Sequence, residues 1–67
     1  MKNTIKVERA KKNITQQQLA ELIGVSRQTI NSIEVNKYVP STVLALKMSK
    51  VFELPVNEFF FLENEDE

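Results

Sequence analysis

Hydrophobic side chains recur at helical spacing in two neighbouring short segments, and a tight turn separates them. In the first segment, Leu19, Leu22 and Ile23 lie at i, i+3 and i+4, which predicts a core-facing stripe. Gly24 then takes the position where helices commonly end in a left-handed residue. Ser26 suits the N-cap of a second helix. Two short helices so close in the chain cross steeply, and the second projects outward, where it can enter a groove.

The rest of the pattern predicts three further helices, which gives an all-α fold of five helices. A first helix is expected over about residues 3–12, with Ile5 and Ala10 facing inward. The fourth helix begins after Ser41. Its apolar residues recur at i, i+4, i+7 and i+8, at Leu44, Met48, Val51 and Phe52. A short fifth helix is expected over residues 56–60.

Polar residues mark the ends of the two central helices. Thr15 and Gln18 form a capping-box pattern at the start of the second helix. Asn36 is suited to a left-handed residue that closes the third helix. The segment after it is expected to be a loop, because Pro40 pushes Val39 towards extended geometry.

The charge balance divides the chain into a basic body and an acidic tail. Nine Lys and Arg balance nine Asp and Glu, for a net charge of +0. Four of the acidic side chains lie in residues 63–67, so residues 1–62 carry nine basic against five acidic groups, a net of +4. We expect one domain over residues 1–62 and a disordered acidic tail over residues 63–67. A basic body is compatible with a polyanionic partner.

Composition excludes several classes of function. Cys and His are absent, which excludes disulfides, thiolate metal sites and histidine chemistry. No glycine-rich loop and no plausible carboxylate pair supports an enzyme or a cofactor, and a domain this small leaves little space for a small-molecule ligand. The chain lacks an apolar run long enough to span a membrane and the apolar core of a signal peptide, so we expect a cytoplasmic protein.

Taken together, these residues resemble the phage-repressor and Cro-like helix-turn-helix family, a large class of small bacterial and phage DNA-binding regulators. The matching stretches cover roughly residues 2–61 and are Thr15-Gln16, Leu19-Ala20, Gly24-Val25-Ser26, Ile30, Ile33-Glu34, Lys37-Tyr38, Pro40-Ser41 and Ala45-Leu46-Lys47. The resemblance implies a sequence-specific transcriptional regulator, expected to be a repressor that binds a palindromic operator in double-stranded DNA as a homodimer. Two residues depart from the family pattern. Glu53 stands where a glycine often follows the fourth helix, and Val35 stands where a polar or basic residue is common.

Helix geometry sorts the side chains of the third helix, residues 26–35, into two faces. At about 100° per residue, Ile30 and Ile33 share the inward face. The outward side carries groups that can hydrogen-bond to base edges in the major groove, namely Arg27, Gln28, Asn31 and Ser32. Polar residues opposite an apolar stripe are also what any solvent-exposed helix shows. The resemblance implies base contacts from this side, and we expect Gln28 and Arg27 to contribute most.

Phosphate contacts are expected on both sides of that helix. The resemblance implies that Gln16 binds a backbone phosphate, helped by the partial positive charge at the N-terminus of its helix, with a solvated glutamine as the alternative. Ser26 opens the third helix, and Lys37 and Tyr38 follow it on the loop, so phosphate contacts are expected from these three as well. Tyr38 could equally pack on the domain.

One basic residue is expected to serve structure instead of DNA binding. In the family that this chain resembles, an Arg at the place of Arg9 pairs with the Glu that closes the third helix, here Glu34. A carboxylate beside an apolar stripe needs a partner to tolerate partial burial. We therefore assign the pair a structural role.

An unbroken apolar run ends the body of the chain, at Phe59, Phe60, Phe61 and Leu62. These four side chains cannot all enter the core of one small domain. We expect one or two of them to form a self-complementary dimer patch, which would set two recognition helices about 34 Å apart on successive major grooves. Alternatively, two phenylalanines fill the core and the others stay partly exposed. A strand over residues 61–62 could pair with its twin or with the N-terminal residues.

The same run supports a second function of another class. A protein-interaction module, such as an antitoxin-like partner, would use the apolar run to bind a different protein. The sequence leaves this alternative open.

Overall fold

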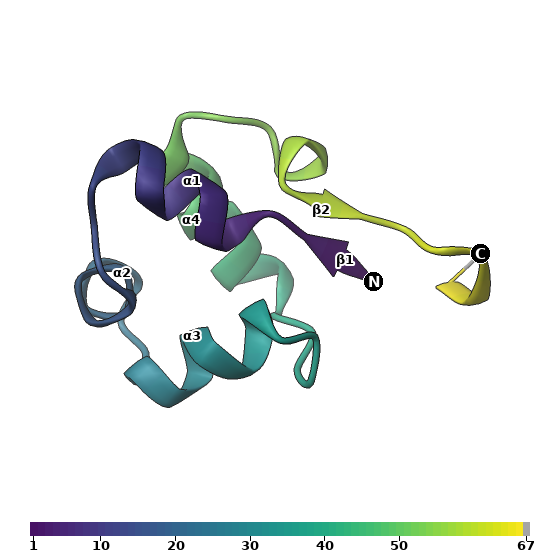
Figure 1. The fold of residues 1–67 in the computed structure, drawn as a ribbon, viewed down its shortest axis with the longest axis horizontal. Helices are drawn as coiled ribbons and strands as arrows, with labels where there is room; N and C mark the ends of the chain where they lie inside the picture. The colour runs from purple at the N-terminus through teal and green to yellow at the C-terminus, as the bar shows by residue number, and fades with distance from the viewer. Residues whose placement is uncertain (67) are drawn as a thin grey trace.

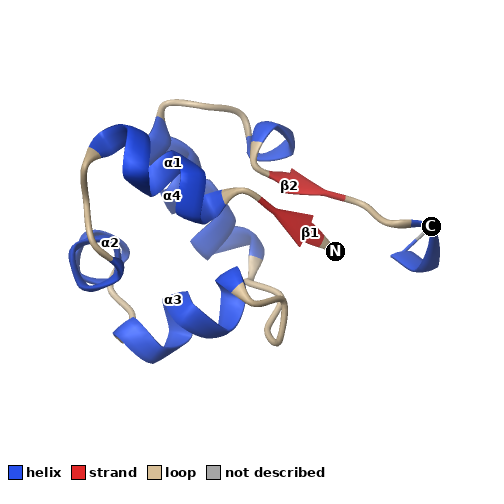
Figure 2. Ribbon diagram, in the orientation of Figure 1, coloured by secondary structure: helices blue, strands red, loops and turns tan. Residues whose placement is uncertain are grey.

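Within residues 1–66, which the computed structural model describes, four α-helices and a small two-stranded sheet make up most of the domain (Figures 1 and 2). The elements follow the chain as β1 (Lys2–Asn3), α1 (Ile5–Lys12), α2 (Gln16–Ile23), α3 (Arg27–Glu34), α4 (Thr42–Phe52), η1 (Val56–Glu58), β2 (Phe60–Phe61) and η2 (Asn64–Asp66). The fold is mostly helical, as predicted, but the described residues do not confirm the predicted count of five helices.

The segment predicted as a fifth helix is a single 3-10 turn followed by a strand. The turn η1 ends at Glu58, and Phe59 after it has a φ of −135°, which leaves helical geometry. The carbonyl of Phe59 accepts a hydrogen bond of 2.9 Å from the N–H of Thr4. Next, β2 pairs antiparallel with β1, with Phe61 opposite Lys2 and Phe60 opposite Asn3. The C-terminal strand therefore pairs with the N-terminal residues, and this pairing shifts the start of α1 to Ile5.

Capping side chains fix the starts of α2, α3 and α4. Thr15 Oγ1 accepts a hydrogen bond of 3.0 Å from the N–H of Gln18, and Gln18 Oε1 accepts one of 2.8 Å from the N–H of Thr15. The predicted capping box is therefore present. Ser26 and Ser41 cap α3 and α4 through their hydroxyl groups. These caps satisfy N–H groups that a helix leaves without partners.

Left-handed residues end or follow the helices. Gly24 (φ 79°) and Asn36 (φ 64°) have this conformation, as predicted. Asn13 (φ 58°) ends α1, and Glu53 (φ 57°) ends α4. Glu53 adopts a conformation that favours glycine, and its carboxylate lies 2.5 Å from the ammonium group of Lys12. An ion pair thus accompanies the strained end of α4.

Among the described residues, ten buried apolar side chains form one core between the helices and the sheet. They come from every α-helix and from the C-terminal segment, and they are Ile5, Leu19, Ala20, Ile23, Ile30, Ile33, Met48, Phe52, Phe59 and Phe60. The prediction for Leu22 was wrong, because this side chain is 62% exposed. The buried arc of α2 runs through Leu19, Ala20 and Ile23, and at about 100° per residue Leu22 lies roughly 110° from the centre of that arc.

Helix α1 buries a mixed face. Ile5 is fully buried, and Glu8 is 8% exposed, with its carboxylate 3.3 Å from the ammonium group of Lys11. The prediction that Ala10 faces inward was wrong. Ala10 is exposed, because it lies about 140° from Ile5 around the helix.

The start of the acidic segment folds back onto the N-terminus. The Met1 ammonium group lies 3.2 Å from a carboxylate oxygen of Glu63 and 2.9 Å from one of Asp66. The hydrogen bond to Asp66, followed by the one to Glu63, raises the pKa of the Met1 ammonium group above its usual range. Where the sequence predicts a disordered tail over residues 63–67, the structure thus has an ion-paired turn up to residue 66, and Glu67 lies outside the described residues.

The helices of the domain are short. The longest, α4, has 11 residues. In the part of the chain that the structure describes, no helix has the length and apolar character that crossing a membrane requires.

Candidate nucleic-acid interface

A tight turn between α2 and α3 holds α3 at one edge of the domain (Figure 1). Gly24 ends α2 in the left-handed conformation, and its N–H donates to the carbonyl of Ala20 at 2.8 Å. The N–H of Val25 donates to the same carbonyl at 2.9 Å, and Lys47 Nζ donates to the carbonyl of Ile23 at 3.4 Å. These bonds satisfy the end of α2, so the chain can turn within the three residues 24–26 and lead directly into α3.

Helix α3 buries one face and exposes the other. Ile30 and Ile33 are 0% and 1% exposed and hold the helix to the core. Three of the four side chains predicted to contact bases, Arg27, Gln28 and Asn31, are exposed, whereas Ser32 is half-buried. The exposed side therefore carries amide and guanidinium groups within one and a half turns of helix, where bidentate hydrogen bonds to base edges are possible.

A hollow lies beside α3, between this helix and the loop that follows it. Its lining residues are Val25, Ser26, Gln28, Thr29, Ser32, Lys37, Tyr38 and Leu44. Three of the residues predicted to contact phosphates, Ser26, Lys37 and Tyr38, thus meet at one place. Ser26 Oγ lies 2.9 Å from Thr29 Oγ1 and also accepts the N–H of Thr29. Tyr38 is 46% exposed, so its ring lies mostly outside the core.

The loop after α3 is tied to the N-terminal strand by Asn3. Asn3 Nδ2 donates to the carbonyl of Ile33 at 3.0 Å and to Asn36 Oδ1 at 2.9 Å. Asn3 Oδ1 accepts the N–H of Ile5 at 3.1 Å, which gives the first N–H of α1 a partner. The sequence reasoning placed Asn3 inside a helix and missed this role. An Asn two residues before an apolar helical position was the available signal.

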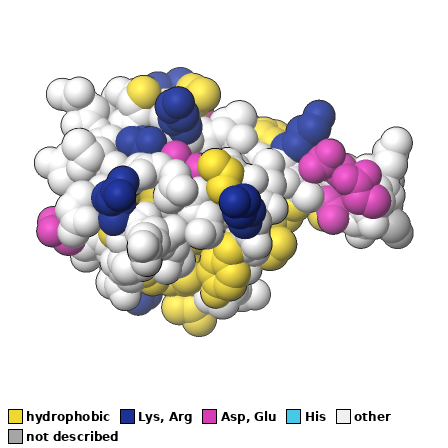
Figure 3. Space-filling view, turned by 60° about the horizontal axis from the view of Figure 1, so that its bottom comes forward, with side chains coloured by type: hydrophobic (Ala, Val, Ile, Leu, Met, Phe, Trp, Pro, Cys, Tyr) yellow, Lys and Arg dark blue, Asp and Glu magenta, His cyan; other side chains and the backbone are white. Residues whose placement is uncertain are grey.

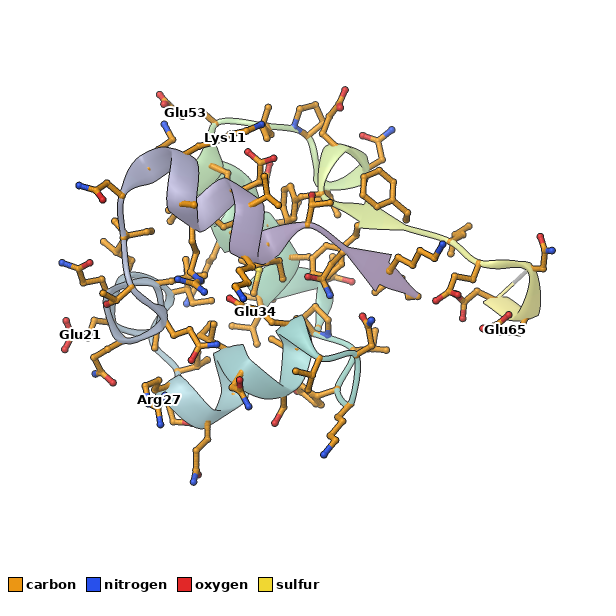
Figure 4. All side chains as sticks on the ribbon, viewed as in Figure 1. Lys11, Glu21, Arg27, Glu34, Glu53 and Glu65 are labelled. Atoms are coloured by element: carbon orange, nitrogen blue, oxygen red, sulfur yellow. The ribbon has the colours of Figure 1, made fainter. Side chains whose placement is uncertain are left out.

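Arg9 and Glu34 form a nearly buried ion pair. Arg9 Nε lies 2.6 Å from Glu34 Oε2, and Arg9 Nη2 lies 3.1 Å from Glu34 Oε1. The two side chains are 13% and 7% exposed. Arg9 Nη1 also donates to the carbonyl of Ile14 at 3.1 Å. The pair joins α1 to the end of α3, and Figure 4 shows Glu34 between these two helices.

The side chain of Gln16 points towards α3. Gln16 Nε2 donates to Glu34 Oε1 at 3.1 Å and to Asn31 Oδ1 at 3.2 Å. Gln16 Oε1 accepts from Arg27 Nη1 at 3.4 Å. The amide that was predicted to bind phosphate is thus engaged within the domain, while the backbone N–H groups in the first turn of α2 remain directed outward from the helix end.

The apolar run at the C-terminus divides between core and surface. Phe59 and Phe60 are 0% and 7% exposed, and the Phe59 ring packs edge-on against that of Phe52, with centroids 5.2 Å apart. Phe61 and Leu62 are 40% and 66% exposed. The structure therefore leaves only the second half of this run on the surface of the chain, which corrects the expectation that Phe59 and Phe60 face a partner.

An apolar groove borders this run at Phe60. It is lined by Met1, Val39, Pro40, Thr42, Ala45, Leu46, Val56 and Phe60. Figure 3 brings the α3 side of the molecule forward: Lys and Arg side chains are spread over it, hydrophobic side chains gather along its lower edge, and acidic ones gather at the C-terminal end. The basic and the apolar surfaces are thus adjacent.

Comparisons with known proteins agree with this arrangement. A helix-turn-helix family model matches residues 5–59. The chain is 46% identical over 66 residues to the HTH-type transcriptional regulator YgzD of Bacillus subtilis, covering 98% of this chain and 100% of the relative. It is 47% identical over 66 residues to the HTH-type transcriptional regulator MJ0272 of Methanocaldococcus jannaschii, with the same coverage. A third such regulator, from Archaeoglobus fulgidus, is 42% identical over 66 residues, covering 98% of this chain and 93% of its own.

These similarities extend over the whole domain and not over the turn alone. They do not favour the alternative of a protein-interaction module. The chain belongs to the Cro/C1-type helix-turn-helix family of transcriptional regulators, with residues 5–59 as its DNA-binding domain.

Proposed function

We propose that this protein is a sequence-specific repressor that binds a palindromic operator as a homodimer, with α3 in the major groove. The observation that carries the proposal is the division of α3 into a buried face, with Ile30 and Ile33, and an exposed face, with Gln28 and Asn31. A helix that packs on the core through one face can place its other face in a groove without losing that packing.

Base reading falls to the exposed face of α3. The amide of Gln28 suits adenine N6 and N7, and the guanidinium of Arg27 suits guanine O6 and N7. Asn31 lies one turn beyond Arg27 on the same face, and Ser32 contributes a hydroxyl at the rim of the hollow. Each good bidentate pair discriminates against the wrong base by about 1–3 kcal/mol.

Phosphate binding falls to the two sides of α3. The backbone N–H groups of Gln16 and Gln17 open α2, where the helix dipole adds partial positive charge, and they suit one strand of the duplex. The hollow lined by Ser26, Lys37 and Tyr38 offers hydroxyls and an ammonium group to the other strand. Such contacts set the register of the protein without reading sequence.

Dimerisation would use the apolar surface beside the basic one. Outside the core, large apolar side chains are exposed at Val39 (65%), Val43 (61%), Leu46 (56%), Phe61 (40%) and Leu62 (66%). Two of them, Val39 and Leu46, line the apolar groove, and exposed apolar side chains at such a groove commonly mark an interface. A two-fold axis through it would present two α3 helices to the same side of the DNA, as half-sites about 34 Å apart require. Repression would then follow from occupation of the operator.

Selection of bound sequences from a random DNA library, followed by a salt titration on the winner, tests this function. The proposal expects a palindrome with half-sites about one helical turn apart, and an affinity that falls steeply as salt rises. Absence of any enriched sequence would contradict sequence-specific binding. An enriched sequence without two-fold symmetry would contradict the homodimer alone.

A further inference from the structure

The carboxylate of Glu34 receives hydrogen bonds from two different helices. Arg9 on α1 donates to both of its oxygens, and Gln16 on α2 donates to Oε1 at 3.1 Å. The Glu34 side chain is only 7% exposed, so it is bound within the domain and does not reach a groove itself. Figure 4 shows Glu34 inside the angle of the helices and Arg27 at the outer end of α3.

This arrangement fixes which way the amide of Gln16 points. An ionised carboxylate only accepts hydrogen bonds, so Gln16 must turn its NH₂ group to Glu34. The second hydrogen of that NH₂ group goes to Asn31 Oδ1 at 3.2 Å. The carbonyl oxygen of Gln16 then points the other way and accepts from Arg27 Nη1 at 3.4 Å. The carboxylate of Glu34 thereby sets the direction of the two hydrogen bonds that Gln16 makes with Asn31 and Arg27.

The direction of these bonds decides what Asn31 offers to a base. Because the carbonyl of Asn31 faces Gln16, its NH₂ group is the end that is free to face the groove. Asn31 is exposed, so no packing opposes that orientation. An outward NH₂ group donates, and it suits the acceptors of the major groove, which are guanine N7 and O6, adenine N7 and thymine O4. The bidentate pairing of Asn with adenine would instead require its carbonyl to face the base as well.

We propose that Glu34 is a positioning residue for DNA recognition: through Gln16 it turns Asn31 into a hydrogen-bond donor towards the bases and holds Arg27 in place. The inference rests on the proposed function, since it concerns how α3 reads a site. A purely structural Glu34 would have no effect on base preference, whereas in this role the buried carboxylate influences base preference without touching DNA.

Glu34→Gln tests the proposal directly. Arg9 still needs an acceptor, so the one oxygen of the new amide would turn to Arg9 and its NH₂ group would face Gln16. The Gln16 amide would then turn over, so that its NH₂ group faces Arg27 and its carbonyl faces Asn31. The Asn31 amide would turn over in response and direct its carbonyl, instead of its NH₂ group, towards the groove. Glu21→Gln is the matched control. It removes the same charge, and Glu21 contacts Gln17 on the outer side of α2, away from this network.

The measurement is the base preference at each operator position, obtained by selection from a random DNA library with the wild-type chain and each variant. At the positions whose preference Asn31→Ala or Arg27→Ala erases, we expect Glu34→Gln to reduce the wild-type preference by about tenfold, the size of one good base contact. Glu21→Gln should leave every preference intact. Loss of folded protein lowers the amount bound but does not change which sequences are enriched, so a merely structural Glu34 would leave the preferences as they are.

Gln16→Met provides a second route, because it removes the connecting amide and leaves the Arg9–Glu34 ion pair in place. We expect it to erase the same preferences, and it decides the question should Glu34→Gln fail to fold. Asn31→Asp keeps an acceptor for Gln16 but has no outward donor, so it should lose the preference at the Asn31 position. Unchanged preferences in Gln16→Met, or in a folded Glu34→Gln, would overturn this inference and leave the proposed function standing. A wild-type chain that enriches no sequence would overturn the proposed function itself.

Discussion

The guanidinium group of Arg9 and the carboxylate of Glu34 meet through two hydrogen bonds of 2.6 and 3.1 Å, which tie the first helix of the chain to the end of the recognition helix. This geometry is bidentate, and the side chains are 13% and 7% exposed. The position of α3 therefore depends on α1 as well as on the apolar side chains behind it.

Replacing Arg9 with Ala should destabilise the domain severely. The change leaves the Glu34 carboxylate buried with only Gln16 as a donor, and breaking a buried pair in this way costs about 3 kcal/mol. Urea unfolding followed by circular dichroism measures the free energy of unfolding. Lys12→Ala is the control, because Lys12 makes an exposed pair with Glu53 and its loss should cost less than about 1 kcal/mol. Equal stability of the two variants would contradict the structural role of Arg9.

The end of α4 offers a test of backbone strain. Glu53 has φ 57°, where a glycine avoids the clash of a Cβ atom. Both Glu53→Gly and Glu53→Ala remove the ion pair with Lys12, so their difference isolates the backbone. We expect the midpoint of thermal unfolding to be about 4 °C higher for Glu53→Gly than for Glu53→Ala. A lower midpoint for the glycine variant would show that the left-handed conformation costs nothing there.

The contact between the N-terminus and the acidic turn should depend on pH in two directions. The backbone N–H of Glu63 and then the Met1 ammonium group lower the pKa of Asp66, so the contribution of Asp66 is complete above about pH 4 and is lost as pH falls through the lowered value. The pKa of the Met1 ammonium group is raised, so its contribution is complete below about pH 8 and is lost as pH rises through the raised value. The contact should therefore be strongest between these limits.

Chemical shifts of the carboxyl carbons of Glu63 and Asp66, followed from about pH 2 to pH 11, measure this contact. Asp66→Asn should remove the part of the acidic transition that comes from Asp66 and keep the alkaline one, because the Glu63 carboxylate still binds the ammonium group. Carboxyl-carbon shifts that follow only the ordinary ionisation of free carboxyl groups would speak against the folded-back turn.

Base contacts and phosphate contacts should separate by mutation. Gln28→Ala should relax the preference at one base position by about tenfold, since it removes one bidentate partner. Lys37→Ala should weaken binding to all sequences alike and reduce the salt dependence by about one phosphate contact. Fluorescence anisotropy on an operator and on single-base variants, at several salt concentrations, distinguishes the two. A uniform loss for Gln28→Ala would contradict its base-reading role.

The exposed half of the apolar run should govern association. Leu62→Glu puts a charge on the surface proposed for the homodimer, and sedimentation equilibrium should then give the mass of one chain where the wild type gives two. Leu22→Glu is a matched control, because Leu22 is similarly exposed (62% against 66%) but lies on α2. Dissociation by both variants, or by neither, would argue against this surface.

Local patterns predicted the helix-turn-helix well. The capping box at Thr15 and the left-handed residues at Gly24 and Asn36 depend on neighbours within four residues, so the chain itself specifies them. Leu22 shows where such reasoning fails. Its spacing fits the stripe as well as that of Ile23, and only the direction of approach of the other helices decides that Ala20 is buried instead.

Long-range pairing explains the other differences. Phe60 and Phe61 have helical and extended options, and the choice depends on Asn3 and Lys2, almost the whole chain away. The orientation of the Gln16 amide likewise depends on Glu34, which belongs to another helix. A single sequence does not show which distant residues come into contact. The sequence therefore indicated Gln16 as a functional residue but not its hydrogen-bond partners.

The pairing of β1 with β2 also has a kinetic consequence. It joins Lys2 to Phe61 and so closes a loop of nearly the full chain, whereas the capped helices and the α2–α3 turn need only nearby residues. The entropy of closing a loop must be lost before distant contacts repay it, so this pairing should form after the helix-turn-helix is assembled. Substitutions in the two strands should then speed unfolding and leave the folding rate nearly unchanged.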